Sequence, residues 1–139
     1  MSLYLGLMSG TSLDGVDGAL VDFSSGSIAV RTHAYEPFPT SLRDTLLALN
    51  TPGDNELHRS ALAANALVEV YARTVGRLLR ESGTPSAAVR AIGAHGQTVR
   101  HRPGEFDGIG YTIQLNNGSL LAERTGIDVV CDFRSRDVA

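Results

Sequence analysis

The sequence predicts an α/β domain built on a mixed β-sheet with flanking helices. Three features predict it: the chain opens with three segments that alternate apolar and polar residues, a long segment with helical periodicity follows, and strands then alternate with helices. Leading strands joined by short turns pair antiparallel, and the later strands join the same sheet. The predicted order is three strands, two helices, two strands, one helix and a final strand.

Residues 3–8, 14–23 and 27–37 are the first predicted strands. Apolar residues alternate there with small or polar ones, which is the period of a half-buried strand. Ser and Gly residues at 9–12 and 24–26 suit the tight turns between them. These three strands are therefore expected to form an antiparallel meander.

A short helix is predicted after the third strand. Pro37 and Pro39 end that strand, and Thr40 or Ser41 is suited to cap a helix that extends to Leu49.

The clearest helix comes next, from an apolar stripe at alternating steps of four and three residues. Asp54 is suited to be its N-cap, and Gly83 followed by Pro85 ends it. The stripe predicts the residues that face the sheet: Leu57, Ala61, Ala64, Val68, Tyr71, Val75 and Leu78.

The second half adds strands and one covering helix. Residues 89–94 are predicted as a buried strand, 100–105 as a polar loop, 111–115 as a short strand, 119–124 as a helix that Gly126 ends, and 127–133 as a buried final strand.

The composition fits one globular domain and argues against several partners. A length of 139 residues is enough for a core, and a formal charge of −3 gives no electrostatic case for nucleic acid. No apolar segment approaches the ~20 residues that span a bilayer, and no basic leader precedes an apolar core, so we expect a cytoplasmic protein without membrane contact. Cys131 is the single cysteine and cannot form an internal disulfide. Because it lies in an apolar segment, it is predicted to be an unreactive core residue. His95 and His101 lack a third ligand at metal spacing, so no zinc site is expected.

The chain contains no lysine, because all twelve of its Lys or Arg residues are Arg. A Walker-A loop and a protein-kinase site both bind phosphates through a lysine, and Schiff-base chemistry needs one. These classes are excluded. Any phosphate contact must come from backbone, hydroxyl groups and a metal.

The turn between the first two strands has the features of a phosphate site. Gly10 lets the backbone approach a ligand, and Thr11 and Ser12 offer hydroxyl donors. Asp14 or Asp17 is suited to hold a Mg²⁺-bound water. A plain hairpin turn is the alternative interpretation.

Three stretches carry a resemblance to a known family. Residues 7–17 have the sequence LMSGTSLDGVD, residues 93–101 GAHGQTVRH, and residues 122–137 AERTGIDVVCDFRSRD. In this order they resemble the anhydro-N-acetylmuramic acid kinase family, over nearly the whole chain. The order of elements also resembles one lobe of the actin/hexokinase-like (ribonuclease H-like) ATPase fold.

The resemblance implies an ATP-dependent sugar kinase of peptidoglycan recycling. Such an enzyme opens 1,6-anhydro-N-acetylmuramic acid with water and phosphorylates O6, which gives N-acetylmuramic acid 6-phosphate. It implies ATP and Mg²⁺ as cofactors. The residues implied to bind the nucleotide are Gly10, Thr11, Ser12, Leu13, Asp14, Gly15, Val16 and Asp17.

It also implies that the amino sugar binds at the second and third stretches. The residues concerned are His95, Gln97, Thr98, Arg134 and Asp137. Arg134 or Arg136 has the fork geometry to bind the lactyl carboxylate, and pairing of these arginines with nearby aspartates is the alternative. His95 as a general base is an alternative to sugar contact.

Family members are more than twice as long as this chain. We therefore expect residues 1–139 to be an N-terminal ATPase-type lobe that binds ATP weakly and phosphorylates nothing alone, with the second lobe and an Asp general base beyond Ala139. The resemblance leaves open a homodimer for the full-length members. The alternatives are a regulatory or non-catalytic ATP-binding module of the same fold, an interaction domain, or a serine hydrolase using Ser9 or Ser12 with His95, which lacks the Gly-x-Ser-x-Gly elbow.

Overall fold

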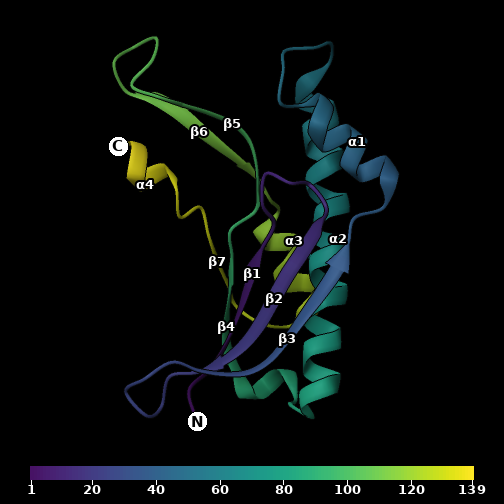
Figure 1. Cartoon of the computed structure of the whole chain (residues 1–139), viewed down its shortest axis with the longest axis vertical. Coiled ribbons are helices and arrows are strands. Elements are labelled where there is room, and N and C mark those ends of the chain that lie inside the picture. Colours follow the sequence, from purple (N-terminus) through teal and green to yellow (C-terminus); the bar gives the residue numbers. More distant parts are fainter.

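The computed structural model describes all 139 residues around one mixed sheet of five strands. Its strands are β1 (Leu3–Met8), β2 (Gly15–Asp22), β3 (Ala29–Pro37), β4 (Val89–Ala94) and β7 (Val129–Cys131). Their order is β3-β2-β1-β4-β7 (Figure 1). β3, β2 and β1 pair antiparallel, whereas β1–β4 and β4–β7 pair in parallel. The predicted fold class, a mixed sheet led by an antiparallel meander, is confirmed.

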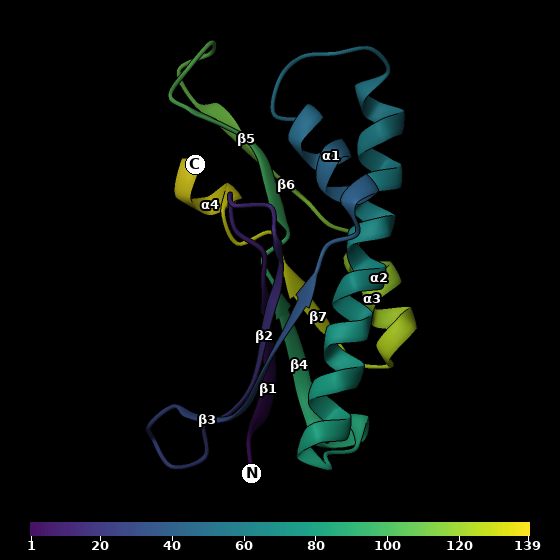
Figure 2. The same cartoon turned by 45° about the vertical axis from the view of Figure 1, so that its right-hand side comes forward.

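The helices α1 (Thr40–Ala48), α2 (Glu56–Ser82) and α3 (Gly118–Thr125) lie on one face of this sheet, whereas the short α4 (Ser135–Val138) lies on the other side, beside β6 (Gly110–Leu115) (Figure 2). A 3₁₀ turn spans Ser86–Ala88. The core fills the space between α2 and the sheet, where Leu5, Leu20 and Ile92 are buried against Leu67 and Tyr71. None of the helices is both long and apolar enough to cross a membrane.

The predicted polar loop at 100–105 was largely wrong, because residues 100–103 belong to a strand. β5 (Gln97–Pro103) pairs antiparallel with β6 (Gly110–Leu115) in a separate two-stranded sheet, which extends beyond the main sheet as an arm (Figure 1). Both faces of the arm are largely solvated toward its tip, so its strands carry polar residues and show no apolar alternation.

The predicted stripe on α2 holds from Ala64 onward and is wrong in the first turns. Leu57 is 88% exposed and Ala61 is exposed, whereas Val68 and Leu78 are buried. A helix of 27 residues is about 40 Å long, roughly twice the length of a six-residue strand, so its first turns project past the sheet.

The N-caps of α1 and α2 were also predicted wrongly. α1 follows Pro39 and α2 follows Asn55, which has φ 56°, and neither residue makes a side-chain cap. The predicted C-terminal glycines are confirmed, since Gly83 and Gly126 both adopt the left-handed conformation.

The last predicted strand is too long and Cys131 is misplaced. β7 has three residues, and Cys131 is exposed because β7 lies at the edge of the sheet. Apolar composition alone does not distinguish an edge strand from a central one. The chain then forms α4, which was not predicted from the sequence.

One buried carboxylate ties the start of the meander together. Asp22 is 2% exposed, and its Oδ2 lies 2.6 Å from Arg31 Nη2. Its Oδ1 accepts hydrogen bonds from the backbone N–H groups of Ser2 (3.1 Å) and Ser24 (2.9 Å). Arg31 and then Ser24 hold the pKa of the Asp22 carboxyl far below its usual value of 3.8.

Because its folded pKa is lowered, Asp22 stabilises the fold above the ordinary carboxyl pKa and loses this effect as pH falls toward the folded value. We expect Asp22→Asn to lower the free energy of unfolding at pH 7, and the deficit relative to wild type to shrink steadily below about pH 4. Denaturant unfolding at pH 7 and at pH 3 checks this. Asp44→Asn, on the exposed side of α1, is the control. A deficit of equal size at both pH values would contradict the prediction.

Candidate functional site

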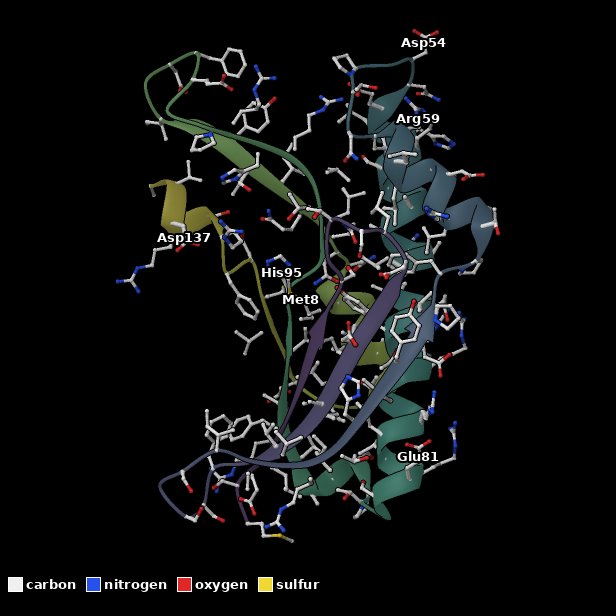
Figure 3. The ribbon with its side chains drawn as sticks, in the orientation of Figure 1. Met8, Asp54, Arg59, Glu81, His95 and Asp137 are labelled. Atoms are coloured by element: carbon white, nitrogen blue, oxygen red, sulfur yellow. The ribbon has the colours of Figure 1, made fainter.

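The carboxyl ends of the parallel strands β1, β4 and β7 meet at one edge of the sheet. In α/β folds this edge is where ligands usually bind. The loop at residues 9–14 leaves β1, His95 leaves β4, and Asp132 leaves β7. The three stretches singled out in the sequence therefore converge although they are far apart in the chain. Figure 3 shows His95 close to Met8, the last residue of β1, and the His95 N–H donates to the Leu7 carbonyl at 3.1 Å.

The loop after β1 is a closed turn with exposed polar side chains. The Leu13 N–H donates to the Gly10 carbonyl at 3.2 Å, and Leu13 adopts φ 56°. Thr11, Ser12 and Asp14 are exposed, and the Ser12 hydroxyl donates to Asp14 Oδ1 at 2.9 Å. Hydroxyl groups and a carboxylate are thus available at the loop surface for a phosphate and its cation.

The eight residues implied to bind the nucleotide divide into two groups. The side chains of Leu13 and Val16 are 5% and 0% exposed and belong to the core, so only their backbone can face a ligand. A Cβ on Gly15 would lie 2.3 Å from the Glu36 carbonyl oxygen and 2.8 Å from the Tyr35 ring, so Gly15 serves the packing of β2 on β3. The accessible residues are Gly10, Thr11, Ser12, Asp14 and Asp17.

Asp14 and Asp17 form a negative cluster beside Tyr35. Asp17 is exposed, and its Oδ1 lies 3.2 Å from His33 Nε2 across the β2–β3 pair. Partial burial of the ring raises the pKa of the Tyr35 phenol first, and the charges of Asp14 and Asp17 add to the shift. Either carboxylate is accessible to a cation, and the protein atoms do not distinguish them.

The second stretch presents one accessible ring and one buried amide. His95 is half-buried, and its Nδ1 lies 2.9 Å from the Gly96 carbonyl oxygen, so Nδ1 carries the proton and Nε2 is left as an acceptor. Thr98 is half-buried and its hydroxyl accepts from Gln114 Nε2 at 3.0 Å. Gln97 is 0% exposed and donates through Nε2 to the Gly10 carbonyl at 3.1 Å. Direct sugar contact by Gln97, as the family resemblance implied, does not fit this burial.

Tyr71 lies beneath the same region, and sequence reasoning assigned it no role beyond packing. It is 0% exposed on α2, and its hydroxyl has no hydrogen-bond partner. Burial raises the pKa of Tyr71 to about 12, and the nearby Ser9 hydroxyl and Gly96 backbone oppose this only in part. A tyrosine inside an apolar helical stripe was the available signal, since a buried phenol keeps a polar end.

The third stretch pairs internally at the chain's end. Arg134 Nε donates to Asp137 Oδ2 at 2.8 Å, and the Ser135 hydroxyl donates to Asp132. The alternative of internal pairing is thus what the structure shows for Arg134, while Arg136 is exposed and forms no ion pair. In Figure 3, Asp137 lies on α4, farther from β1 than His95.

Known proteins resemble this chain over nearly all of its length. The family model described as anhydro-N-acetylmuramic acid kinase matches residues 2–139. Curated proteins of that name are 69% identical in Variovorax paradoxus, 66% in Albidiferax ferrireducens and 58% in Bordetella pertussis, each over 137 residues and 99% of this chain. The chain spans 35–36% of the length of these relatives.

A solved structure resembles the fold alone. A reductive activator for a corrinoid, iron-sulfur protein superposes with a TM-score of 0.50 at 17% identity, over 67% of this chain and 14% of its own. It supports the α/β architecture. The sequence match, which runs through all three stretches at the sheet edge, establishes that the chain belongs to the anhydro-N-acetylmuramic acid kinase family.

Proposed function

We propose that this chain provides the nucleotide-binding part of an ATP-dependent kinase that opens 1,6-anhydro-N-acetylmuramic acid and phosphorylates its O6. The observation that carries the proposal is the family match over residues 2–139, which includes three stretches that leave three neighbouring strand ends. A cytoplasmic location is part of the proposal, since ATP is the phosphoryl donor.

The loop after β1 fits a nucleotide phosphate without a lysine. The hydroxyl groups of Thr11 and Ser12 are exposed, and Gly10 leaves open space above the backbone. A Cβ at Gly10 would have Ser12 Oγ as its nearest neighbour, at 3.9 Å. Asp14 or Asp17 would hold Mg²⁺ through oxygen, the ligand type this ion prefers. Bound ATP supplies the phosphoryl group, and the chain's own groups position and neutralise it.

The sugar is proposed to lie between the ends of β4 and β7. His95 offers Nε2 as an acceptor, and Thr98 offers a partly accessible hydroxyl. Arg136 is available for the lactyl carboxylate, and Arg134 would become available if it left Asp137.

The general base that activates water is proposed to come from outside residues 1–139. Of the carboxylates at this edge, Asp14 and Asp17 are the proposed Mg²⁺ ligands, Asp137 is paired with Arg134, and Asp132 accepts from the Ser135 hydroxyl. A base needs a free carboxylate near the attacked carbon, so an acid brought from elsewhere in the protein is the better candidate.

Binding and turnover of the purified 139-residue chain test this assignment. We expect MgATP to shift the backbone amide resonances of residues 10–14 in ¹⁵N-labelled protein. We expect no sugar phosphate in a ³¹P assay with ATP, Mg²⁺ and the anhydro sugar, because the base is supplied elsewhere. Formation of sugar phosphate by this chain alone would contradict the placement of the base. Absence of loop shifts at millimolar MgATP would contradict the nucleotide site.

Two glycines separate nucleotide contact from packing. Gly10→Ala is expected to keep the melting temperature and weaken MgATP binding about tenfold, because the methyl group occupies the approach to the phosphate. Gly15→Ala is expected to destabilise the fold by about 1–3 kcal/mol, because its Cβ would clash with the Glu36 carbonyl and the Tyr35 ring. Thermal unfolding and calorimetric titration measure the two effects. Wild-type affinity in Gly10→Ala would rule out close approach of phosphate at Gly10.

A further inference from the structure

Gln97 is the first residue of β5, and its side chain crosses to the loop that leaves β1. The residue is 0% exposed, and Nε2 donates to the Gly10 carbonyl at 3.1 Å and to the Thr98 carbonyl at 3.2 Å. The contact joins residues 87 positions apart. A second side-chain link joins the same loop and turn, since the Ser9 hydroxyl donates to the Gly96 carbonyl at 3.4 Å, but the link that reaches Gly10 is that of Gln97.

The Gly10 carbonyl is the point that closes the loop. It accepts one hydrogen bond from the Leu13 N–H at 3.2 Å and a second from Gln97. Leu13 adopts φ 56°, a left-handed conformation that is unfavourable for a residue with a Cβ. The turn therefore depends on its surroundings, and Gln97 is the polar group that fixes it from below.

The carbonyl oxygen of the Gln97 side chain indicates that this residue does not serve mainly to stabilise the fold. Oε1 is buried and has no hydrogen-bond partner. An unsatisfied buried acceptor is destabilising, and an apolar side chain of similar size would avoid this penalty. The Tyr71 hydroxyl, near Ser9 of the same loop, is also buried without a partner. Two such groups beneath one loop are more consistent with holding a site in shape than with strengthening the core.

We infer that Gln97 is a positioning residue that couples the conformation of the loop at residues 9–14 to the turn at His95 and Gly96. The inference rests on the proposed function, in which that loop binds nucleotide phosphate and that turn faces the sugar. Nucleotide bound at the loop fixes the position of the Gly10 carbonyl. The Gln97 amide, which donates to that carbonyl, then fixes the turn at His95 and Gly96 on the sugar side. By linkage, each ligand then strengthens binding of the other.

Hydrogen exchange of the ligand-free chain tests the link independently of any nucleotide. We expect Gln97→Met to speed exchange of the Leu13 amide about tenfold, since one hydrogen bond on the Gly10 carbonyl is lost. Exchange of the Ile92 amide in the central strand β4 is expected to stay within about twofold of wild type, because the loss is local to the loop. Gln114→Met is the matched control, because Gln114 Nε2 donates to Thr98 and Thr112 hydroxyls and does not touch the loop.

An unchanged Leu13 amide in Gln97→Met, or an equal effect in Gln114→Met, would overturn the inference. A nuclear Overhauser measurement on the wild-type protein tests the same contact without relying on a variant that could fail to fold. Two protons that share the Gly10 carbonyl lie close enough for a nuclear Overhauser effect, so one is expected between the Gln97 side-chain amide and the Leu13 amide. Its absence would also overturn the inference.

Titration with MgATP tests the coupling. In wild type and Gln114→Met, shifts are expected to spread from residues 10–14 to His95 and Gly96. In Gln97→Met, shifts are expected to stay within the loop, with about tenfold weaker binding. Shifts that still reach His95 in Gln97→Met would overturn the coupling. If MgATP shifts no loop resonance in any variant, the proposed nucleotide site fails, and the exchange experiment still decides the role of Gln97.

Discussion

The arrangement of the site depends on the burial of α2 against the sheet. About 50 residues separate β3 from β4, and they form two helices that return the chain parallel to β1. Leu67, Val68 and Leu78 are 0% exposed in this contact, and each buried side chain of this size contributes roughly 1.5–3 kcal/mol relative to an exposed one. The contact fixes the register of β4 beside β1. Leu7 and His95 thereby come within hydrogen-bond distance.

The same contact explains why glycines in the first stretch have different tasks. A Cβ at Gly18 would lie 2.7 Å from Thr74 and 2.9 Å from Leu78, so that position lets α2 approach β2 closely. Gly15 lets β3 approach β2, whereas Gly10 faces open space. One sequence stretch thus combines packing glycines with a ligand-facing one, and only the fold tells them apart.

Much of the fold could be predicted from the sequence, namely the parts that local periodicity or turn residues determine. The meander, α2 from Ala64 onward and the glycine C-caps follow from local patterns and are confirmed. The errors arise where tertiary context decides. Residues 100–103 of β5 were predicted as a loop because they are polar, and they are polar because the arm is solvated. Cys131 is exposed because β7 is an edge strand. α2 begins after Asn55 and not after the predicted cap Asp54. For the site, the sequence predicted the loop and His95 as polar groups at strand ends, but it could not show that Gln97 is buried beneath Gly10, since that contact spans 87 positions.

The arm formed by β5 and β6 is buried most deeply at its root, and farther out it contacts α2 through the Arg100–Glu56 ion pair and α4 along β6. At its root, Gln97, Val99 and Leu115 are buried, and at its tip Phe106 is 75% exposed. The backbone amides of such a hairpin are expected to exchange fastest at the tip and slowest at the root, since each residue pair farther from the root has fewer buried neighbours. At the root, Gly96 has φ 81° and the Leu115 carbonyl lies 2.6 Å from where its Cβ would be, so only glycine fits this position. Gln97 therefore belongs both to the root of the arm and to the contact beneath the loop after β1, so local opening of the arm disturbs that loop only once it reaches the root.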